Sequence, residues 1–255
     1  MAESNRQAGI PIWLRPEPAT RRPRFSRDQI AATAVAIADA EGFEAVSMRR
    51  IAAALGAGTM SLYRYIETKA DLLALMDDAL LGDTVVPGEL PADWREALVL
   101  VARQTRSAYL PHPWAMQVLQ GRPAAEAPIP GPNGLRHFEQ SLAALQGAPL
   151  DTAAKFDLLA ILADYVFGHL LHAAETSERI RAASADEKAA QAAEAAEAAA
   201  EFGRAQLATG EFPYLAALAG QPDADVLGGP DRQAERFERG LRLIIDGIAA
   251  KAAGS

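Results

Sequence analysis

The stretch MRRIAAALGAGTMSLYRYI, Met48 to Ile66, decides the fold of the N-terminal part of the chain. Apolar residues recur at helical spacing on both sides of a glycine pair. Gly56 and Gly58 allow a tight reversal, because glycine accepts backbone conformations that other residues avoid. The spacing therefore predicts a short helix before the glycines and a second helix over roughly residues 59–66. Two short helices joined by such a turn are typical of a helix-turn-helix.

The second of these helices carries an unusual outer face. With Leu62 and Ile66 four residues apart and turned inward, its remaining polar side chains are predicted to point outward: Ser61, Tyr63, Arg64 and Tyr65. In a DNA-binding helix-turn-helix the second helix lies in the major groove. Hydroxyls suit phosphate oxygens, and a guanidinium can fork onto a guanine. An ordinary helical hairpin is the alternative interpretation, and the spacing favours DNA binding.

Helix signals also dominate the rest of the chain. Ser26, with Gln29 three residues on, predicts a capped first helix that ends at Gly42, and Thr68 predicts the cap of a fourth helix. Further helical periodicity covers residues 92–109, 114–119, 135–145, 151 to beyond 170, and 234–250. No run alternates like a strand. We therefore expect an all-α protein with a three-helix helix-turn-helix domain and a larger helical bundle.

Composition suggests how these parts divide. Residues 1–24 are rich in Pro and Arg and are predicted to form a basic flexible arm, followed by the helix-turn-helix domain over 25–70 and the larger helical bundle over 71–255. Residues 182–201 contain 12 alanines interleaved with glutamates, so this segment could be helical or disordered.

The net charge of −8 is unevenly placed. Residues 1–81 hold 10 of the 25 Lys and Arg and 10 of the 33 Asp and Glu, so the whole excess of acid falls on residues 82–255. Six arginines gather before or at the start of the first helix: Arg6, Arg15, Arg21, Arg22, Arg24 and Arg27. This asymmetry fits a DNA-facing end on an acidic body, and it fits a solvated basic tail equally well.

Several classes of protein are disfavoured. The chain has no cysteine, which fits a reducing compartment and excludes disulfides and thiolate metal sites. We expect no signal peptide, because the first residues lack an apolar run, and no membrane span, because no segment approaches 18 consecutive apolar residues. These three features predict a cytoplasmic protein. Phosphate-binding, dinucleotide-binding and hydrolase motifs are missing, so the sequence also predicts that the protein is not an enzyme and has no cofactor.

The segment FSRDQIAATAVAIADAEGFEAVSMRRIAAALGAGTMSLYRYIETKADLLALMDDAL closely resembles the N-terminal domain of TetR-family transcriptional regulators. Three motifs carry the resemblance: AEGFEAVSMRRIA, LGAGTMSLYRYI and the K-x-x-L-L opening of the fourth helix. The remainder looks like the ligand-binding and dimerisation region of the tetracycline-repressor-like branch, on GPNGLRHFEQSLAAL, FPYLAALA and FERGLRLIIDGI, so the resemblance implies a ligand-binding and dimerisation domain over 71–255 and a DNA-binding domain over 25–70.

The resemblance implies a set of DNA contacts. By position, Thr59, Met60, Ser61 and Arg64 would lie at or near base edges, and Arg49 at the start of the preceding helix could also reach a base. Tyr63, Tyr65 and Lys69 look like phosphate contacts. Lys69 stands at a helix N-terminus, which itself attracts anions. The arm bearing Arg21, Arg22 and Arg24 would add further phosphate or minor-groove contacts.

The resemblance also implies a homodimer, a double-stranded DNA operator and a small-molecule effector. In relatives, the helices corresponding to residues 151–174 and 234–250 pair with their symmetry mates, and the neighbouring helices surround a pocket. Pocket candidates are Tyr109, His112, Trp114, Met116, Phe138, Asp157, Tyr165 and His169, although a plain core role is the more frequent one for any single aromatic or Met residue among them. AMQVLQGRP lacks the metal-ligating histidine of tetracycline-binding relatives, which argues against tetracycline.

One group invites a metal interpretation. His169, His172 and Glu175 fall at positions i, i+3 and i+6 of one helix. Their ends are almost two turns apart, so we expect no metal site. The sequence as a whole predicts a ligand-responsive repressor that binds a palindromic operator as a homodimer. The alternative is a helical sensor or adaptor that acts through protein partners.

Overall fold

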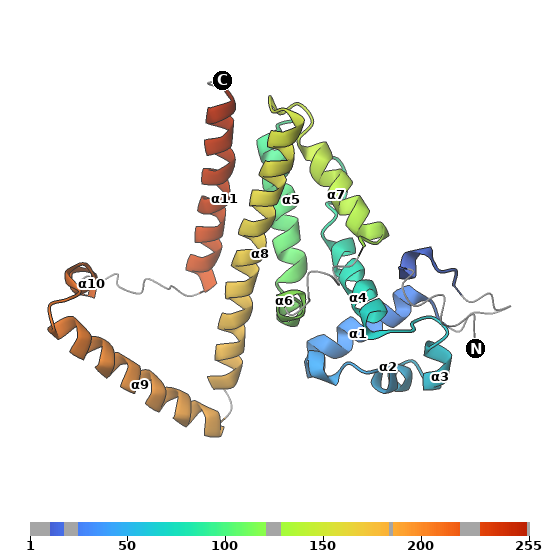
Figure 1. Cartoon of the computed structure of the whole chain (residues 1–255), viewed down its shortest axis with the longest axis horizontal. Helices are drawn as coiled ribbons and strands as arrows, with labels where there is room; N and C mark the ends of the chain where they lie inside the picture. Colours follow the sequence, from blue (N-terminus) through green and yellow to red (C-terminus); the bar gives the residue numbers. More distant parts are fainter. Residues whose placement is uncertain (1–10, 18–24, 121–128, 184–185, 220–229, 254–255) are drawn as a thin grey trace. The chain divides into compact units, whose positions relative to one another are not determined.

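The computed structural model describes residues 11–17, 25–120, 129–183, 186–219 and 230–253 (Figure 1). Over these ranges the protein contains eleven α-helices, two 3-10 turns and no strand, as the sequence predicts. The chain divides into two compact units. Residues 1–171 and 241–255 form the first, and residues 172–240 form the second.

The first unit begins with the helix-turn-helix domain. It comprises α1 (Arg27–Glu41), the 3-10 turn η3 (Phe43–Ala45), α2 (Met48–Ala54), α3 (Thr59–Leu62) and α4 (Lys69–Asp83). The predicted caps are confirmed. Ser26 forms a capping box with Gln29 at the start of α1, and Thr68 forms one with Asp71 at the start of α4. Each box satisfies two backbone N–H groups that the first helical turn leaves free.

The turn between α2 and α3 differs in detail from the expectation. Of its two glycines, only Gly56 has a positive φ, of 62°, whereas Gly58 is extended and serves as the N-cap of α3. Helix α3 is also shorter than predicted, because it ends at Leu62 and the chain continues as a turn through Tyr65. Leu62 and Ile66 are both buried, as expected.

Residues 11–17, which the sequence places in a flexible arm, fold back onto this domain. They form the 3-10 turn η2 (Ile12–Leu14), in which Ile12 is buried. The buried Arg15 pairs with the carboxylates of Asp71 and, at 3.1 Å, Glu67. The Arg27 guanidinium donates to the carbonyl oxygens of Ile12 and Arg15. Residues 1–10 and 18–24, including Arg21, Arg22 and Arg24, lie outside the described residues.

The body of the first unit is built around α4. It contains α5 (Trp94–Tyr109), α6 (Pro113–Gln120), α7 (Pro132–Ala144) and parts of α8 (Thr152–Ala183) and α11 (Pro230–Ala253). One side of α4 packs against α1, and other parts of it pack against α5 and α7 (Figure 1). The guanidinium of Arg242 on α11 forks onto Glu96 of α5. Helix α4 therefore belongs to both the helix-turn-helix domain and the bundle.

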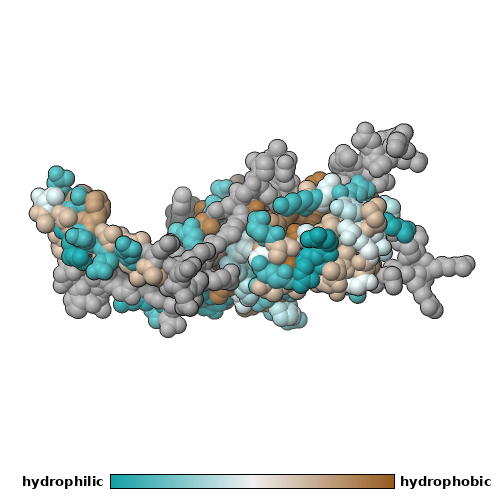
Figure 2. Space-filling model, turned by 90° about the horizontal axis from the view of Figure 1, so that it is seen from below, coloured by the Kyte–Doolittle hydropathy of each residue, from teal (hydrophilic) through white to brown (hydrophobic). Residues whose placement is uncertain are grey.

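The second unit contains the Ala-rich segment. The structure places residues 186–208 in helix α9 (Asp186–Ala208), followed by α10 (Pro213–Ala219). Large apolar side chains are exposed on these helices and in the link between them: Phe202, Phe212, Tyr214, Leu215 and Leu218. Figure 2 shows apolar surface among polar side chains in this unit. The segment that could have been disordered is thus helical from residue 186 onward, and residues 184–185 are not described.

Helix α8 is the most apolar long element. Its span from Thr152 to Ser177 is long and apolar enough to cross a membrane by length and composition, with a mean hydropathy of 1.3. No such span was expected from the sequence, because no segment approaches 18 consecutive apolar residues. The same helix buries Leu158, Leu162, Val166 and Leu170 within the protein. Its apolar character is therefore partly that of a core helix.

The joint between α4 and α7 rests on one carboxylate. Asp78 Oδ1 accepts the backbone N–H groups of Asn133, at 3.0 Å, and Gly134, at 2.9 Å. Burial raises the pKa of Asp78, and these two N–H groups oppose that rise. Gly131 fits tightly beside it, because a Cβ there would lie 2.4 Å from Asp78 Oδ1 and 2.5 Å from the Trp13 ring.

We expect Asp78→Ala to lower the free energy of unfolding by about 1–3 kcal/mol, because two buried N–H groups at the start of α7 lose their acceptor. Urea unfolding followed by circular dichroism measures the change. Asp83→Ala removes the same charge from the exposed end of α4 and should change stability by less than about 0.5 kcal/mol. Equal losses in the two variants would contradict this account of the joint.

Candidate functional site

The surface formed by α3 and the following turn presents most of the predicted DNA-contacting side chains. Met60 is 77% exposed and Tyr63 is 46% exposed. Arg64 is also exposed, and Thr59 and Ser61 are partly exposed. Arg49 is exposed on α2. A short helix that offers hydroxyls, a phenol and a guanidinium to solvent has the chemistry needed to contact phosphates and base edges.

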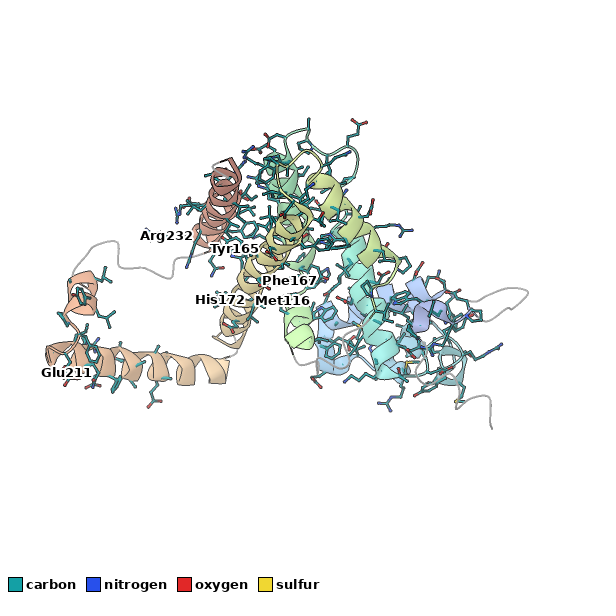
Figure 3. All side chains as sticks on the ribbon, turned by 45° about the horizontal axis from the view of Figure 1, so that its top comes forward. Met116, Tyr165, Phe167, His172, Glu211 and Arg232 are labelled. Carbon is teal, nitrogen blue, oxygen red and sulfur yellow. The ribbon has the colours of Figure 1, made fainter. Side chains whose placement is uncertain are left out.

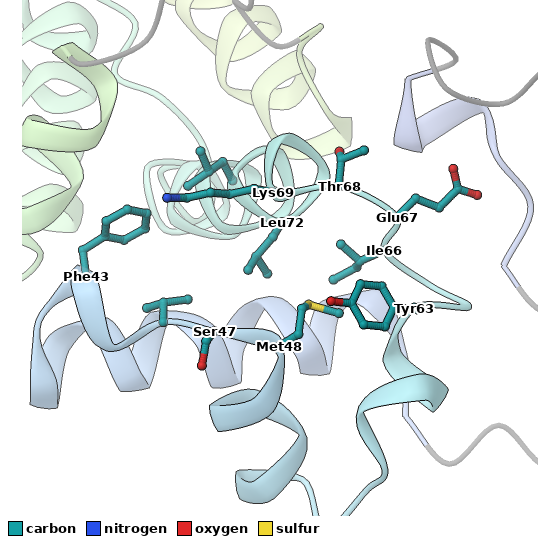
Figure 4. Close-up of a pocket in the computed structure, with 11 residues that line it drawn as sticks. Phe43, Ser47, Met48, Tyr63, Ile66, Glu67, Thr68, Lys69 and Leu72 are labelled. Atoms are coloured by element: carbon teal, nitrogen blue, oxygen red, sulfur yellow. The ribbon is translucent and has the colours of Figure 1, made fainter. Parts of the chain in front are cut away.

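A hollow of about 280 Å³ lies beside this surface (Figure 4). Its walls come from η3, the start of α2, the turn after α3 and the first turns of α4, and its lining includes Tyr63 and Lys69. The Lys69 ammonium lies 5.4 Å from the centre of the Phe43 ring. This contact keeps the cation at the N-terminus of α4, where free backbone N–H groups also favour an anion.

The position of Tyr65 differs from the one expected from the sequence. Tyr65 was expected on the outward face, yet it is only 6% exposed, and its ring lies 5.1 Å from that of Phe25. The backbone oxygen of Tyr65 also accepts from Arg27 Nε at 3.3 Å. Tyr65 follows the buried Leu62 by three residues, a spacing that places two side chains next to each other on a helix, and the turn carries its ring into the core. Tyr65 is a structural residue of the domain.

A cavity of about 390 Å³ lies within the bundle. Helices α4, α5, α7 and α8 form its walls, and most of its lining side chains are apolar, including three phenylalanines: Phe138, Phe156 and Phe167. The exceptions are Thr105 on α5 and His137 and Ser141 on α7. A mostly apolar cavity with a few polar groups is the usual form of a small-molecule site.

The polar groups of the cavity are held by specific hydrogen bonds. His137 Nδ1 lies 2.8 Å from Thr84 Oγ1, and the Thr84 hydroxyl donates to the Leu81 carbonyl at 2.7 Å. Ser141 donates to the His137 carbonyl at 2.8 Å. Burial lowers the pKa of His137, so the neutral imidazole is favoured.

Only one of the eight predicted pocket residues lines this cavity. Phe138 does so, and it is paired with Phe156 at 6.0 Å between ring centres. Tyr109 is buried against Phe167, and its hydroxyl donates to Asp77. Asp157 is exposed on α8, and Met116 is buried on α6. Tyr165 lies two residues before Phe167 and leaves α8 on another side (Figure 3).

Two further candidates belong to a different contact. His112 Nδ1 lies 2.7 Å from Asp39 Oδ1, and Trp114 Nε1 donates to the same oxygen at 2.7 Å. The Trp114 ring also stacks on Phe43, with 5.8 Å between centres. These residues fasten the start of α6 to the end of α1. They connect the bundle to the helix-turn-helix domain and do not line the cavity.

The remaining candidate, His169, is a hydrogen-bond acceptor for Arg106 Nε at 3.0 Å. His172 lies 3.7 Å from Glu175. Within the described ranges, no group of three or more His, Asp or Glu side chains is arranged to hold a metal ion.

The three polar residues that line the cavity, His137, Ser141 and Thr105, were not among the predicted pocket residues. A signal was present in GPNGLRHFEQSL: the inner face of α7 carries Gly134, His137 and Ser141, which are small or polar where a packed helix would carry large apolar residues. A helix that faces a core with such residues leaves space beside it.

Together these features define a class: an all-helical regulator with an N-terminal DNA-reading helix-turn-helix and a bundle that contains a small-molecule cavity. Residues 30–76 match the family described as "Bacterial regulatory proteins, tetR family", and residues 86–252 match the "Tetracyclin repressor-like, C-terminal domain". The chain belongs to the TetR family of transcriptional regulators. This family is not enzymatic, which agrees with the expectation from the sequence.

Relatives cover nearly the whole chain. The HTH-type transcriptional repressor DrrR1 of Streptomyces coeruleorubidus is 36% identical over 239 residues, which span 89% of this chain and 78% of the relative. An HTH-type transcriptional regulator of Saccharopolyspora erythraea is 34% identical over 94% of this chain and 92% of its own length. The crystal structure of ActR from Streptomyces coelicolor in complex with actinorhodin has a TM-score of 0.64 and 30% identity, and the match covers 89% of this chain and 96% of ActR.

The two tyrosines of the turn should differ in their effect on stability. We expect Tyr65→Ala to lower the free energy of unfolding by about 3–5 kcal/mol, because it empties a buried aromatic site against Phe25. Tyr63→Ala should cost less than about 1 kcal/mol, because the side chain is nearly half exposed. Urea unfolding of both variants tests this difference, and a larger loss for Tyr63→Ala would contradict the assignment.

Stability should also fall with pH because of His137. Its folded-state pKa lies below the ordinary value of 6.5, so the unfolded chain takes up the proton first as pH falls. The free energy of unfolding should decline from about pH 6.5 downward until the folded-state pKa is reached. Urea midpoints measured between pH 5 and 8 should show a shallower decline for His137→Gln than for the original chain. His172→Gln, at an exposed position, should keep the original slope.

Proposed function

We propose that this chain is a ligand-responsive transcriptional repressor. It binds a palindromic double-stranded DNA operator as a homodimer in the cytoplasm, and a small-molecule effector in the α4–α5–α7–α8 cavity releases it. Members of the TetR family are typically cytoplasmic, and relatives support the repressor and the small-molecule parts of the proposal. DrrR1 is named as a repressor, and ActR was solved with the small molecule actinorhodin.

The observation that carries the proposal is the continuity of α4. Lys69 begins the helix beside the DNA-reading surface, and Leu81 near its other end lines the cavity. The 15 residues of α4 span about 22 Å without a break. A ligand that moves the cavity end of a stiff helix also moves its DNA end. The coupling required for a switch is modest, typically about 1–3 kcal/mol.

Exposed apolar side chains on the bundle support the homodimer. Ile161 of α8 is 45% exposed and Leu243 of α11 is 68% exposed. Gly168 and Gly247 on the same two helices have open space where a Cβ would stand, so another helix can approach closely. Two recognition helices in a twofold dimer would read half-sites about 34–36 Å apart. Moving the two helices relative to each other would break that match.

The DNA that flanks the chain's own gene is the first probe of this proposal. We expect a mobility shift with dimer stoichiometry, weakened for all sequences by Lys69→Gln. The dependence of log K on log salt should become shallower by about 2 for this variant, because each of the two subunits loses one phosphate contact. Lys155→Gln on α8 makes the same charge change away from the reading surface, and it should leave the salt dependence unaltered.

Tyr63→Phe and Tyr65→Phe make a matched pair in the same assay. The first should weaken DNA binding by about 5- to 100-fold through loss of one hydrogen bond in each subunit, and the second should not. Arg64→Ala should relax preference at one operator position in a randomised-sequence selection. If the protein binds none of the flanking DNA even at low salt, the repressor proposal fails, and the adaptor that acts through protein partners becomes the better hypothesis.

A further inference from the structure

The walls of the bundle cavity carry no charged side chain among the described lining residues. Phe138, Phe156 and Phe167 contribute aromatic surface from two helices, α7 and α8, and aliphatic side chains fill most of the rest. A flat aromatic ring packs well against such surface. The volume of about 390 Å³ is at the lower end of the range of small-molecule sites.

Two of the three polar groups have already used their protons. The Thr105 hydroxyl donates to the Val101 carbonyl at 2.9 Å, and the Ser141 hydroxyl donates to the His137 carbonyl at 2.8 Å. A hydroxyl has one proton and two acceptor lone pairs. Each oxygen can therefore offer a ligand only an acceptor.

The third polar group, His137, is fixed by a chain of two hydrogen bonds. The Leu81 carbonyl can only accept, so the Thr84 hydroxyl donates its single proton there. The contact of 2.8 Å between Thr84 Oγ1 and His137 Nδ1 then requires the proton on Nδ1. In a neutral imidazole with a protonated Nδ1, Nε2 is an acceptor. Among the described residues, none is hydrogen-bonded to Nε2.

Each of the three polar groups of the cavity can therefore only accept a hydrogen bond from a ligand. We propose that the effector is an uncharged, flat aromatic molecule with at least one aromatic hydroxyl, which donates to Nε2 of His137. This inference rests on the effector-binding role proposed above for the cavity. Such a molecule satisfies a polar group that an apolar ligand would cover and leave unpaired.

The same geometry disfavours charged effectors. A carboxylate or phosphate would bring further acceptors to a site that offers no donor, and a cation would be desolvated without a carboxylate on the lining. The aromatic hydroxyl is a better donor than an aliphatic one, because its proton is more acidic. The cavity therefore selects by the direction of the hydrogen bond as well as by shape.

Three naphthalene probes of similar size test this selection by titration calorimetry on the full chain. We expect 2-naphthol to bind about 3- to 10-fold more tightly than 2-methoxynaphthalene, the range that one net hydrogen bond supplies. The anion 2-naphthoate should show no measurable binding at pH 7.5. Equal affinity for the naphthol and its methyl ether, or tighter binding of the naphthoate, would overturn the proposal.

Variants then assign the preference to one atom. His137→Phe should still bind both neutral probes, but its ratio of affinities should fall to about one. His172→Phe makes the same exchange at an exposed position and should keep the original ratio. A preference that persists in a folded His137→Phe would overturn the role of Nε2. If that variant does not fold, the comparison of the three probes on the original chain still decides the proposal.

A release assay separates this inference from the proposed function. If an anionic or cationic compound that competes for the cavity releases the chain from DNA while neutral aromatic hydroxyl compounds do not, the inference fails and the repressor remains. If 2-naphthol binds with the expected preference but occupancy does not release the DNA, the donor preference of the cavity stands, and its role as the effector switch fails.

Discussion

Asp78 accepts two backbone N–H groups at the start of α7, and through them α7 takes its place against α4. The carboxylate is buried, and burial alone would disfavour its charge, so those N–H groups stabilise the charged form and fix the geometry at once. Helix α7 in turn brings His137 to Thr84 and Ser141 to the cavity. If α7 shifted, the donor and acceptor pattern of the cavity would be lost with it.

The same helix that holds Asp78 also serves the DNA-reading domain, so two sites share one rigid body. The N-terminal end of α4 is set by the capping box of Thr68 and Asp71, and Asp71 also pairs with Arg15. A second connection runs from α6 to α1 through Trp114 and Asp39. The bundle thus touches the reading domain through α4, through the contact between α6 and α1, and through Trp13, whose Nε1 donates to the Ile129 carbonyl. A displacement within the bundle would turn the domain about those contacts, because packed interfaces shift as units.

Local chemistry explains which features could be predicted from the sequence. Ser26 and Thr68 cap helices with residues three positions away, so their roles were visible in short stretches, and the buried Leu62 and Ile66 followed from helical spacing. Tyr65 was misplaced because only Leu62 and Ile66 were assigned to the inner face, although Tyr65 lies three residues after Leu62 and its ring packs on Phe25. The tautomer of His137 depends on Thr84, 53 residues away, and no local pattern contains that contact.

The segment over residues 11–17 alters what counts as the smallest stable DNA-reading unit. The family match to this part begins at residue 30, and the helix-turn-helix signal begins at Ser26. Yet Ile12 and Arg15 supply a buried side chain, a partner for Asp71 and carbonyl acceptors for the buried Arg27. A truncated domain that starts at residue 25 would leave a guanidinium and a carboxylate without these partners. The boundary of a folding unit can therefore precede the boundary of a sequence family by a turn of chain that carries no motif of its own.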